Sequence, residues 1–222
     1  ADAYQELAEL GLCGLYVPDD LGGLGMGPVE GMVVMEELGR GIVLEPLAQA
    51  LIAGAVLGHY APKPLATEWA GAVASGESLV SLAYQERAAR YRLDNCTTQA
   101  SGKDGAWTLS GAKSLVVAGD RADAYLVSAM RDGTLAIFLV ERNAPGVKLR
   151  AYGVLDGGRA AELMLDAAPA QLVSRDGLAV LAHAVDIGIA ATCAQAVGVM
   201  DKTLAITAEY LNTRKQFGVV IS

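Results

Sequence analysis

The chain has 222 residues, of which 53% are hydrophobic and 19% are charged, and its formal net charge is −8. This length and composition suffice for one large domain or two smaller ones with a buried core. The negative charge disfavours nucleic acid as a partner, because phosphate binding needs a basic surface. No uninterrupted apolar stretch approaches the ~18 residues of a membrane span, and the first residues lack a signal-peptide pattern. We therefore expect a cytoplasmic protein with neither a nucleic-acid nor a membrane partner.

The cysteines are few, odd in number and widely scattered, at Cys13, Cys96 and Cys193. A disulfide framework would require an even number at closer spacing, so we expect free thiols in a reducing compartment. Their spacing matches no metal-binding pattern, and we expect no metal site.

Residues 1–77 are predicted to form an N-terminal helical domain. Pro28 is placed as the first residue of a helix, a position that accepts proline because the N–H group that proline lacks would have no intrahelical acceptor there. Pro62 and Pro64 are expected to interrupt the helical pattern, with a shorter helix over residues 65–74.

From residue 78 the helical pattern gives way to short β-prone runs that follow one another without intervening helices. This pattern over residues 78–168 predicts a middle domain of antiparallel strands with a barrel-like form. Ser101 to Gly105 have the composition of a hairpin turn. Strands are expected at 78–84, 114–117, 124–129, 135–140 and, as the last of the domain, 161–165.

Residues 169–222 are predicted to begin a C-terminal helical domain, with one helix running from Gly177 to about Phe217 and Gly218 ending it in a left-handed conformation. Arg214 supplies donors that suit phosphate, and Phe217 a flat face that suits a purine ring. The alternative is a plain helix end, with cations complementing the helix dipole and Phe217 covering the core.

The sequence from Arg214 through Gln216, Phe217 and Gly218 resembles the signature of the acyl-CoA dehydrogenase family, and the glycine-rich segment 10–25 resembles an early motif of that family. The resemblance implies an α+β fold of a helical domain, a β-domain and a C-terminal helical bundle. It also implies that Arg214, Gln216 and Phe217 reach the FAD of a neighbouring subunit.

The same resemblance implies an FAD-dependent oxidoreductase of fatty acid metabolism. Such a flavoprotein removes hydrogens from the α and β carbons of an acyl-CoA thioester and passes electrons to an electron-transferring flavoprotein. A dimer or tetramer, homomeric or heteromeric, is expected. The catalytic glutamate of the family lies C-terminal to Ser222, so no catalytic residue is assigned. We expect a partial chain that does not catalyse dehydrogenation alone.

Two segments that hold flavin in the family are altered here. In the first, Tyr84 and Gln85 stand in a stretch where relatives carry threonine and glycines, and only Glu86 and Ala89 match. In the second, the tryptophan and threonine that flank the flavin ring in relatives are replaced here by aliphatic residues. We assign cofactor binding in this second segment to Leu115, Val116 and Val117, as an apolar wall beside the flavin.

These departures leave two interpretations open. In one, the pocket still binds flavin, with Gln85 as a substitute polar contact and with Arg87, Arg90 and Arg92 near the phosphates. In the other, the pocket has decayed and the chain is a non-catalytic companion that completes the FAD site of a heteromeric dehydrogenase. The run from Lys113 to Asp120 resembles the small subunit of pimeloyl-CoA-type dehydrogenases, which favours the second interpretation.

Overall fold

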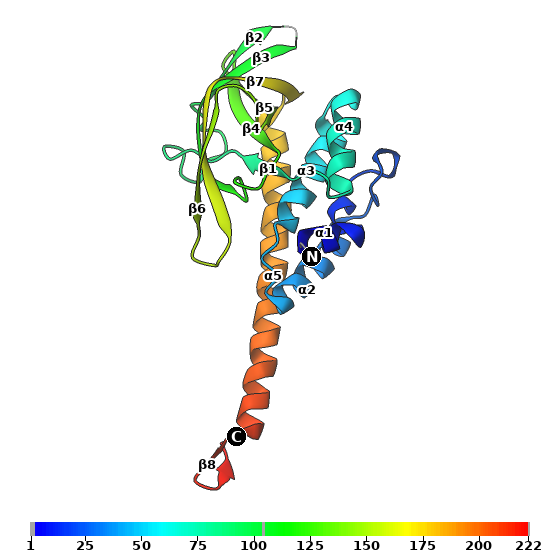
Figure 1. Ribbon diagram of the computed structural model, residues 1–222, viewed down its shortest axis with the longest axis vertical. Coiled ribbons are helices and arrows are strands. Elements are labelled where there is room, and N and C mark those ends of the chain that lie inside the picture. The colour runs from blue at the N-terminus through cyan, green and yellow to red at the C-terminus, as the bar shows by residue number, and fades with distance from the viewer. Residues whose placement is uncertain (1–2, 104, 222) are drawn as a thin grey trace.

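The computed structural model describes residues 3–103 and 105–221. Helices α1 to α4, a curved β-domain and the long helix α5 follow one another along the chain (Figure 1). The predicted α+β class and its order of helical, β and helical parts are confirmed. Asp104, in the predicted hairpin turn, lies outside the described residues, whereas the strands on either side of it pair as expected.

The N-terminal part contains four α-helices: α1 (Ala3–Glu9), α2 (Pro28–Gly41), α3 (Leu47–Tyr60) and α4 (Lys63–Ala74). Pro28 occupies the first turn of α2, as predicted. The prediction for Pro64 was wrong, because this proline lies inside the first turn of α4. A proline is accepted in a first turn because its missing N–H has no intrahelical partner there.

Seven strands make the main sheet: β1 (Val80–Ala83), β2 (Gln99–Lys103), β3 (Ala106–Val117), β4 (Ala124–Arg131), β5 (Thr134–Glu141), β6 (Val147–Gly153) and β7 (Arg159–Ser174). The sheet is mainly antiparallel, as predicted, but β1 pairs with β4 in parallel. The last strand is far longer than the predicted 161–165, because β7 pairs in turn with β3, β5 and β6. β6 was missed, although the alternation of Val147 and Leu149 with Lys148 and Arg150 is the pattern of a strand with one exposed face.

Helix α5 (Gly177–Thr213) ends earlier than predicted. Arg214 is already extended, and β8 (Lys215–Gln216) pairs with β9 (Val219–Val220). Phe217 and Gly218 both have positive φ angles, 50° and 86°, and form the turn of this hairpin. Gly218 is therefore a hairpin glycine rather than a helix stop, because two successive positive φ angles are what a tight hairpin turn requires.

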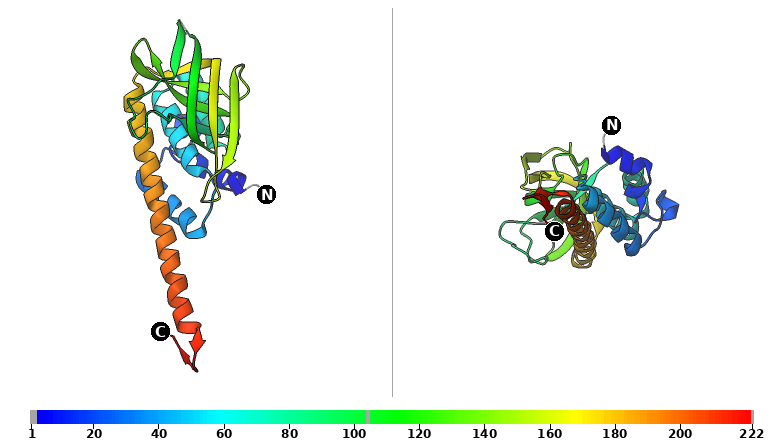
Figure 2. Two further views of the ribbon diagram at one scale, coloured as in Figure 1. Left: turned by 90° about the vertical axis from the view of Figure 1, so that its left-hand side faces the viewer. Right: turned by 90° about the horizontal axis from the view of Figure 1, so that it is seen from below.

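Helix α5 packs along α2 and then projects well past the other helices (Figures 1 and 2). Gly39 and Gly198 lie where the two backbones approach each other. A Cβ at Gly39 would overlap the carbonyl oxygen of Gln195, and a Cβ at Gly198 would overlap that of Glu36. Arg40 of α2 also pairs with Asp201 of α5. Glycines thus set the closeness of this helix pair.

The expectation that no stretch resembles a membrane span needs qualification. By length and composition alone, α5 is long and apolar enough to cross a membrane. The mean hydropathy of its most apolar 18 residues is 1.7, and 33% of these residues are buried. The buried residues of α5, among them Val180, Leu181 and Ala184, belong to the same core as those of α2 and α3. This part of α5 is accordingly a packed helix of the folded domain.

Candidate functional site

A cavity of about 390 Å³ lies where α3, α5 and the ends of β1 and β3 meet. Its wall combines apolar side chains with a few polar ones, as ligand cavities of several hundred Å³ usually do. The lining residues are Gln49, Ile52, Leu82, Tyr84, Gln85, Leu115, Val117, Ala184, Val185, Gly188, Ile189, Thr192 and Cys193. The structure therefore brings together Tyr84, Gln85, Leu115 and Val117, which sequence reasoning had grouped as cofactor-binding residues.

An irregularity in β3 determines which of its side chains reach the cavity. The pairing of β3 with β7 shifts between Lys113 and Val116, and Leu115 has a φ of 51°. The extra residue changes the alternation of the strand. Leu115 and Val117 are therefore about half exposed, whereas Val116 is 1% exposed and packs in the core. Val116, predicted as part of the flavin wall, does not line the cavity.

The polar groups of the cavity are held by local hydrogen bonds. The Gln85 side-chain amide donates to the Tyr84 hydroxyl at 3.2 Å, and the Gln85 carbonyl accepts from the Ser114 N–H at 2.9 Å. The side-chain Oε1 of Gln49 accepts from the backbone N–H of Leu82 at 3.0 Å. These bonds fix the end of β1 between α3 and β3.

A buried ion pair lies beside this wall. The Lys113 ammonium contacts the Glu86 carboxylate at 2.7 Å, and the two side chains are 0% and 4% exposed. Burial alone would raise the pKa of Glu86. Hydrogen bonds from Lys113, Thr97 and Thr98 together with the charge of Lys113 outweigh burial and hold that pKa far below its usual value.

The loop after Glu86 holds the arginines that were expected near flavin phosphates. Arg92 makes a two-point ion pair with Asp94, its Nη2 lying 2.7 Å from the carboxylate, and Arg87 lies 3.5 Å from Glu162. Arg90 is exposed and has a φ of 52°. Among the described residues no ion pair is formed by Arg90, which makes it the arginine of this loop most available to an anion.

Arg214 directly follows α5, and Gln216 and Phe217 lie in the hairpin after it, whereas the α5 residues that line the cavity lie in the first half of the helix. All three are exposed, Phe217 fully so. They are not part of the cavity of their own chain. Residues at this distance contribute to a flavin site only if that site belongs to another subunit.

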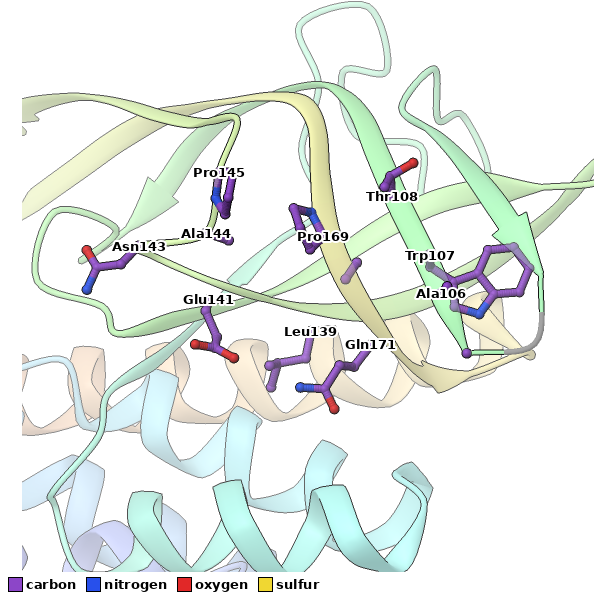
Figure 3. A pocket seen from close by; sticks show the side chains of 12 residues that line it. Ala106, Trp107, Thr108, Leu139, Glu141, Asn143, Ala144, Pro145, Pro169 and Gln171 are labelled. Atoms are coloured by element: carbon purple, nitrogen blue, oxygen red, sulfur yellow. The ribbon is translucent and has the colours of Figure 1, made fainter.

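A second, larger hollow of about 590 Å³ lies on the β-domain, lined by residues of β3, β5 and β7 (Figure 3). Glu141, Asn143 and Gln171 give it a polar character, and Trp107 lies at one end. No residue of the predicted site lines it, and it has no wall from the helices. We therefore place the candidate site in the smaller cavity, where three parts of the chain converge.

The helical wall of the cavity was missed by sequence reasoning. Gln49 is a lone polar residue within an otherwise apolar turn of α3, and that pattern was the available signal. Gly188 and Thr192 lie one turn apart on α5, but small residues in a helix indicate close packing as readily as a cavity. Only the tertiary arrangement distinguishes the two.

Comparisons with known proteins identify the family of the chain. The family model described as "Acyl-CoA dehydrogenase, N-terminal domain" matches residues 1–77, and the one described as "Acyl-CoA dehydrogenase, middle domain" matches residues 81–167. The chain belongs to the acyl-CoA dehydrogenase family. Members of this family are FAD-dependent flavoproteins.

Similar proteins include the acyl-CoA dehydrogenase FadE27 of Mycobacterium tuberculosis, 29% identical over 97% of this chain and 57% of that protein. Among solved structures, a "Tcur3481-Tcur3483 steroid ACAD G363A variant" is 30% identical with a TM-score of 0.86, covering 98% of this chain and 59% of that one. The ChsE4-ChsE5 complex of M. tuberculosis is 29% identical with a TM-score of 0.84, covering 98% and 59%. This acyl-CoA dehydrogenase chain thus spans about three-fifths of the length of such relatives.

Proposed function

We propose that this chain is a subunit of an FAD-dependent oxidoreductase that dehydrogenates an acyl-CoA thioester between its α and β carbons. The observation that carries the proposal is the convergence of Tyr84, Gln85, Leu115 and Val117 on one cavity with α3 and α5. FAD, when bound, supplies the acceptor for the hydride that leaves the β carbon.

The residues present fit such a cofactor and substrate in their chemistry. Leu115 and Val117 offer an apolar wall that excludes water from a flat ring, and the Gln85 amide offers a hydrogen bond at its edge. Arg90, which is exposed and forms no ion pair within the described residues, is the proposed contact for a phosphate. Gly188 and Thr192, being small, leave room along α5 for an acyl chain.

The cavity wall contains no carboxylate among its lining residues. Removal of the weakly acidic α-proton needs a general base of raised pKa within hydrogen-bond reach. We infer that this base is supplied from outside the described residues, by a C-terminal segment or by another subunit. An electron-transferring flavoprotein as electron acceptor is part of the same proposal and rests on the family resemblance.

A second candidate is a non-catalytic companion subunit whose Arg214 and Phe217 complete the FAD site of a partner. Two observations favour it: the flavin-facing positions Leu115 and Val117 lack hydrogen-bonding groups, and Arg214 and Phe217 lie far from their own cavity. The ChsE4-ChsE5 complex and the Tcur3481-Tcur3483 pair are each named as two different chains. This makes a heteromer a reasonable form for the present chain as well.

An absorbance spectrum of the purified protein, alone and then co-purified with a large-subunit homologue, tests the proposal. Flavin bands in the lone protein, abolished by Leu115→Asp, place the cofactor in the cavity described above. Leu155→Asp is the matched control, because Leu155 is fully exposed on the β6–β7 turn. No dehydrogenation by the lone protein is expected, and turnover without a partner would contradict the absence of a base.

The same experiment separates the two candidates. Bands that appear only with the partner, and that are lost on Phe217→Ala but retained on Leu115→Asp, identify the companion role. Absence of flavin bands both in the lone protein and in the protein with its partner would contradict both candidate functions.

A further inference from the structure

The Glu86–Lys113 pair is the most deeply buried charged group described in this chain, and the proposed function does not use it. Glu86 accepts from the Thr97 N–H at 2.7 Å and from the Thr98 N–H and hydroxyl at 3.1 and 2.7 Å. Lys113 donates to Glu86 at 2.7 Å and to the Ser128 hydroxyl at 3.0 Å. Every strong partner of both charges is therefore supplied from within the β-domain.

Such a pair is poorly explained by stability alone. Removing two charges from water costs more than their attraction commonly returns, and well-packed apolar residues of similar volume are often as stable or more so. A buried ion pair in the core of the β-domain is therefore better explained if it holds particular chain segments in place. Its position supports this explanation, because both residues adjoin the cavity wall along the chain.

Glu86 directly follows Gln85, and Lys113 directly precedes the irregular segment that carries Leu115. The Lys113 ammonium lies 3.5 Å from the Tyr84 carbonyl oxygen, and the Ser114 N–H donates to the Gln85 carbonyl at 2.9 Å. The ion pair thus ties together the two segments that present Gln85 and Leu115 to the cavity.

Leu115 itself needs such support. Its φ of 51° is in the left-handed region, where a leucine is strained by contact of its Cβ with the backbone. A residue in this conformation persists only when its surroundings fix it. Lys113 and Ser114 fix the chain immediately before it, and the Ala118 N–H, bonded to the Arg159 carbonyl at 2.8 Å, fixes the chain after it.

We propose that Glu86 and Lys113 are a positioning pair that clamps the Tyr84–Gln85 segment against the irregular segment of β3 and so holds Gln85 and Leu115 in the geometry that flavin requires. The flavin part of this inference rests on the proposed function. The clamp itself is a property of the protein without any ligand.

The test is the double variant Glu86→Gln/Lys113→Met in the full chain. Glutamine keeps an acceptor for the Thr97 and Thr98 N–H groups, and methionine fills the volume of the lysine stem, so the fold is retained while the ionic clamp is removed. Lys63→Met/Asp20→Asn is the matched control, an exposed ion pair between the start of α4 and the segment before α2, away from the cavity. Ser128→Ala is a milder second variant that deletes only one acceptor of Lys113.

Two readouts are measured on each variant. We expect amide hydrogen exchange at Ser114 and Leu115 to accelerate at least tenfold in the double variant, with exchange in α2 and α3 unchanged. We expect FAD, titrated by quenching of its fluorescence, to bind at least tenfold more weakly. Ser128→Ala is expected to show smaller changes in the same direction, and the exposed-pair control none.

Unchanged exchange at Ser114 and Leu115, or exchange that accelerates uniformly across the protein, would overturn the clamp and leave a merely structural pair. Accelerated local exchange with unchanged FAD affinity would overturn the link to flavin. If the parent protein binds no FAD alone or with its partner, the proposed function fails, while local exchange still decides whether the pair is a clamp.

Discussion

At the scale of single residues, the charge of Glu86 can be buried because its neighbours stabilise it. Glu86 is ionised inside the β-domain because Lys113 and the two threonines stabilise its charge, whereas the loop arginines remain at the surface. Glu86 matches the family pattern in the sequence, but no role was predicted for it. Its partner is 27 positions away, and no spacing rule connects the two.

This carboxylate makes a specific prediction about acid stability. Folding lowers the pKa of Glu86 from an unfolded value of ~4.3. Its contribution to the free energy of unfolding is therefore complete above that pH and declines as the pH falls below it. The limiting slope is ~1.4 kcal/mol per pH unit, or about 1.5 kcal/mol in total between pH 5 and pH 3. Urea unfolding at several pH values should show this decline in the parent protein, and less of it in Glu86→Gln/Lys113→Met.

Glu77→Gln is the control for that measurement, since it removes an exposed carboxylate that forms no ion pair within the described ranges. Its pH dependence should follow that of the parent. An equally steep decline in the double variant would mean that other groups carry the acid sensitivity.

At the scale of elements, the contact between α2 and α5 depends on glycine. Gly198→Ala should destabilise the protein by ~1–3 kcal/mol, because the added methyl would overlap the Glu36 carbonyl and force the helices apart. Gly188→Ala, in the same helix, meets only the end of the Ile52 side chain at 3.6 Å. It should instead stabilise by ~0.5–1 kcal/mol through helix propensity. Thermal unfolding of the two variants compares them, and equal effects would contradict the close-packing argument.

The elements also show what sequence alone can specify. Helix α2 was predicted because its start is marked by Pro28, a residue that fits the first turn of a helix. The parallel pairing of β1 with β4 was not predictable, because β-propensity carries no information about partners. The left-handed Leu115 was missed for a related reason: a leucine gives no local signal of positive φ, and the conformation is imposed by neighbouring strands.

At the scale of the whole molecule, the distal part of α5 is the part without internal support. All residues from 199 to 221 are exposed, and the helix extends past the other helices and the main sheet (Figure 2). Val197, Met200, Leu204 and Leu211 recur at helical spacing along it. An apolar stripe of this length is typical of a surface that is covered in an assembly.

We therefore expect the protein to self-associate through this stripe when no other partner covers it. Met200→Lys/Leu204→Lys should lower the weight-average mass in sedimentation equilibrium at the same concentration, because two charges would have to be buried to preserve the contact. Thermal stability of each chain should change little, since both side chains are exposed. Ala205→Lys/Asn212→Lys adds the same charge about a quarter-turn around the helix, so it controls for net charge. If the two double variants sediment alike, association depends on overall charge, and the stripe is not the contact.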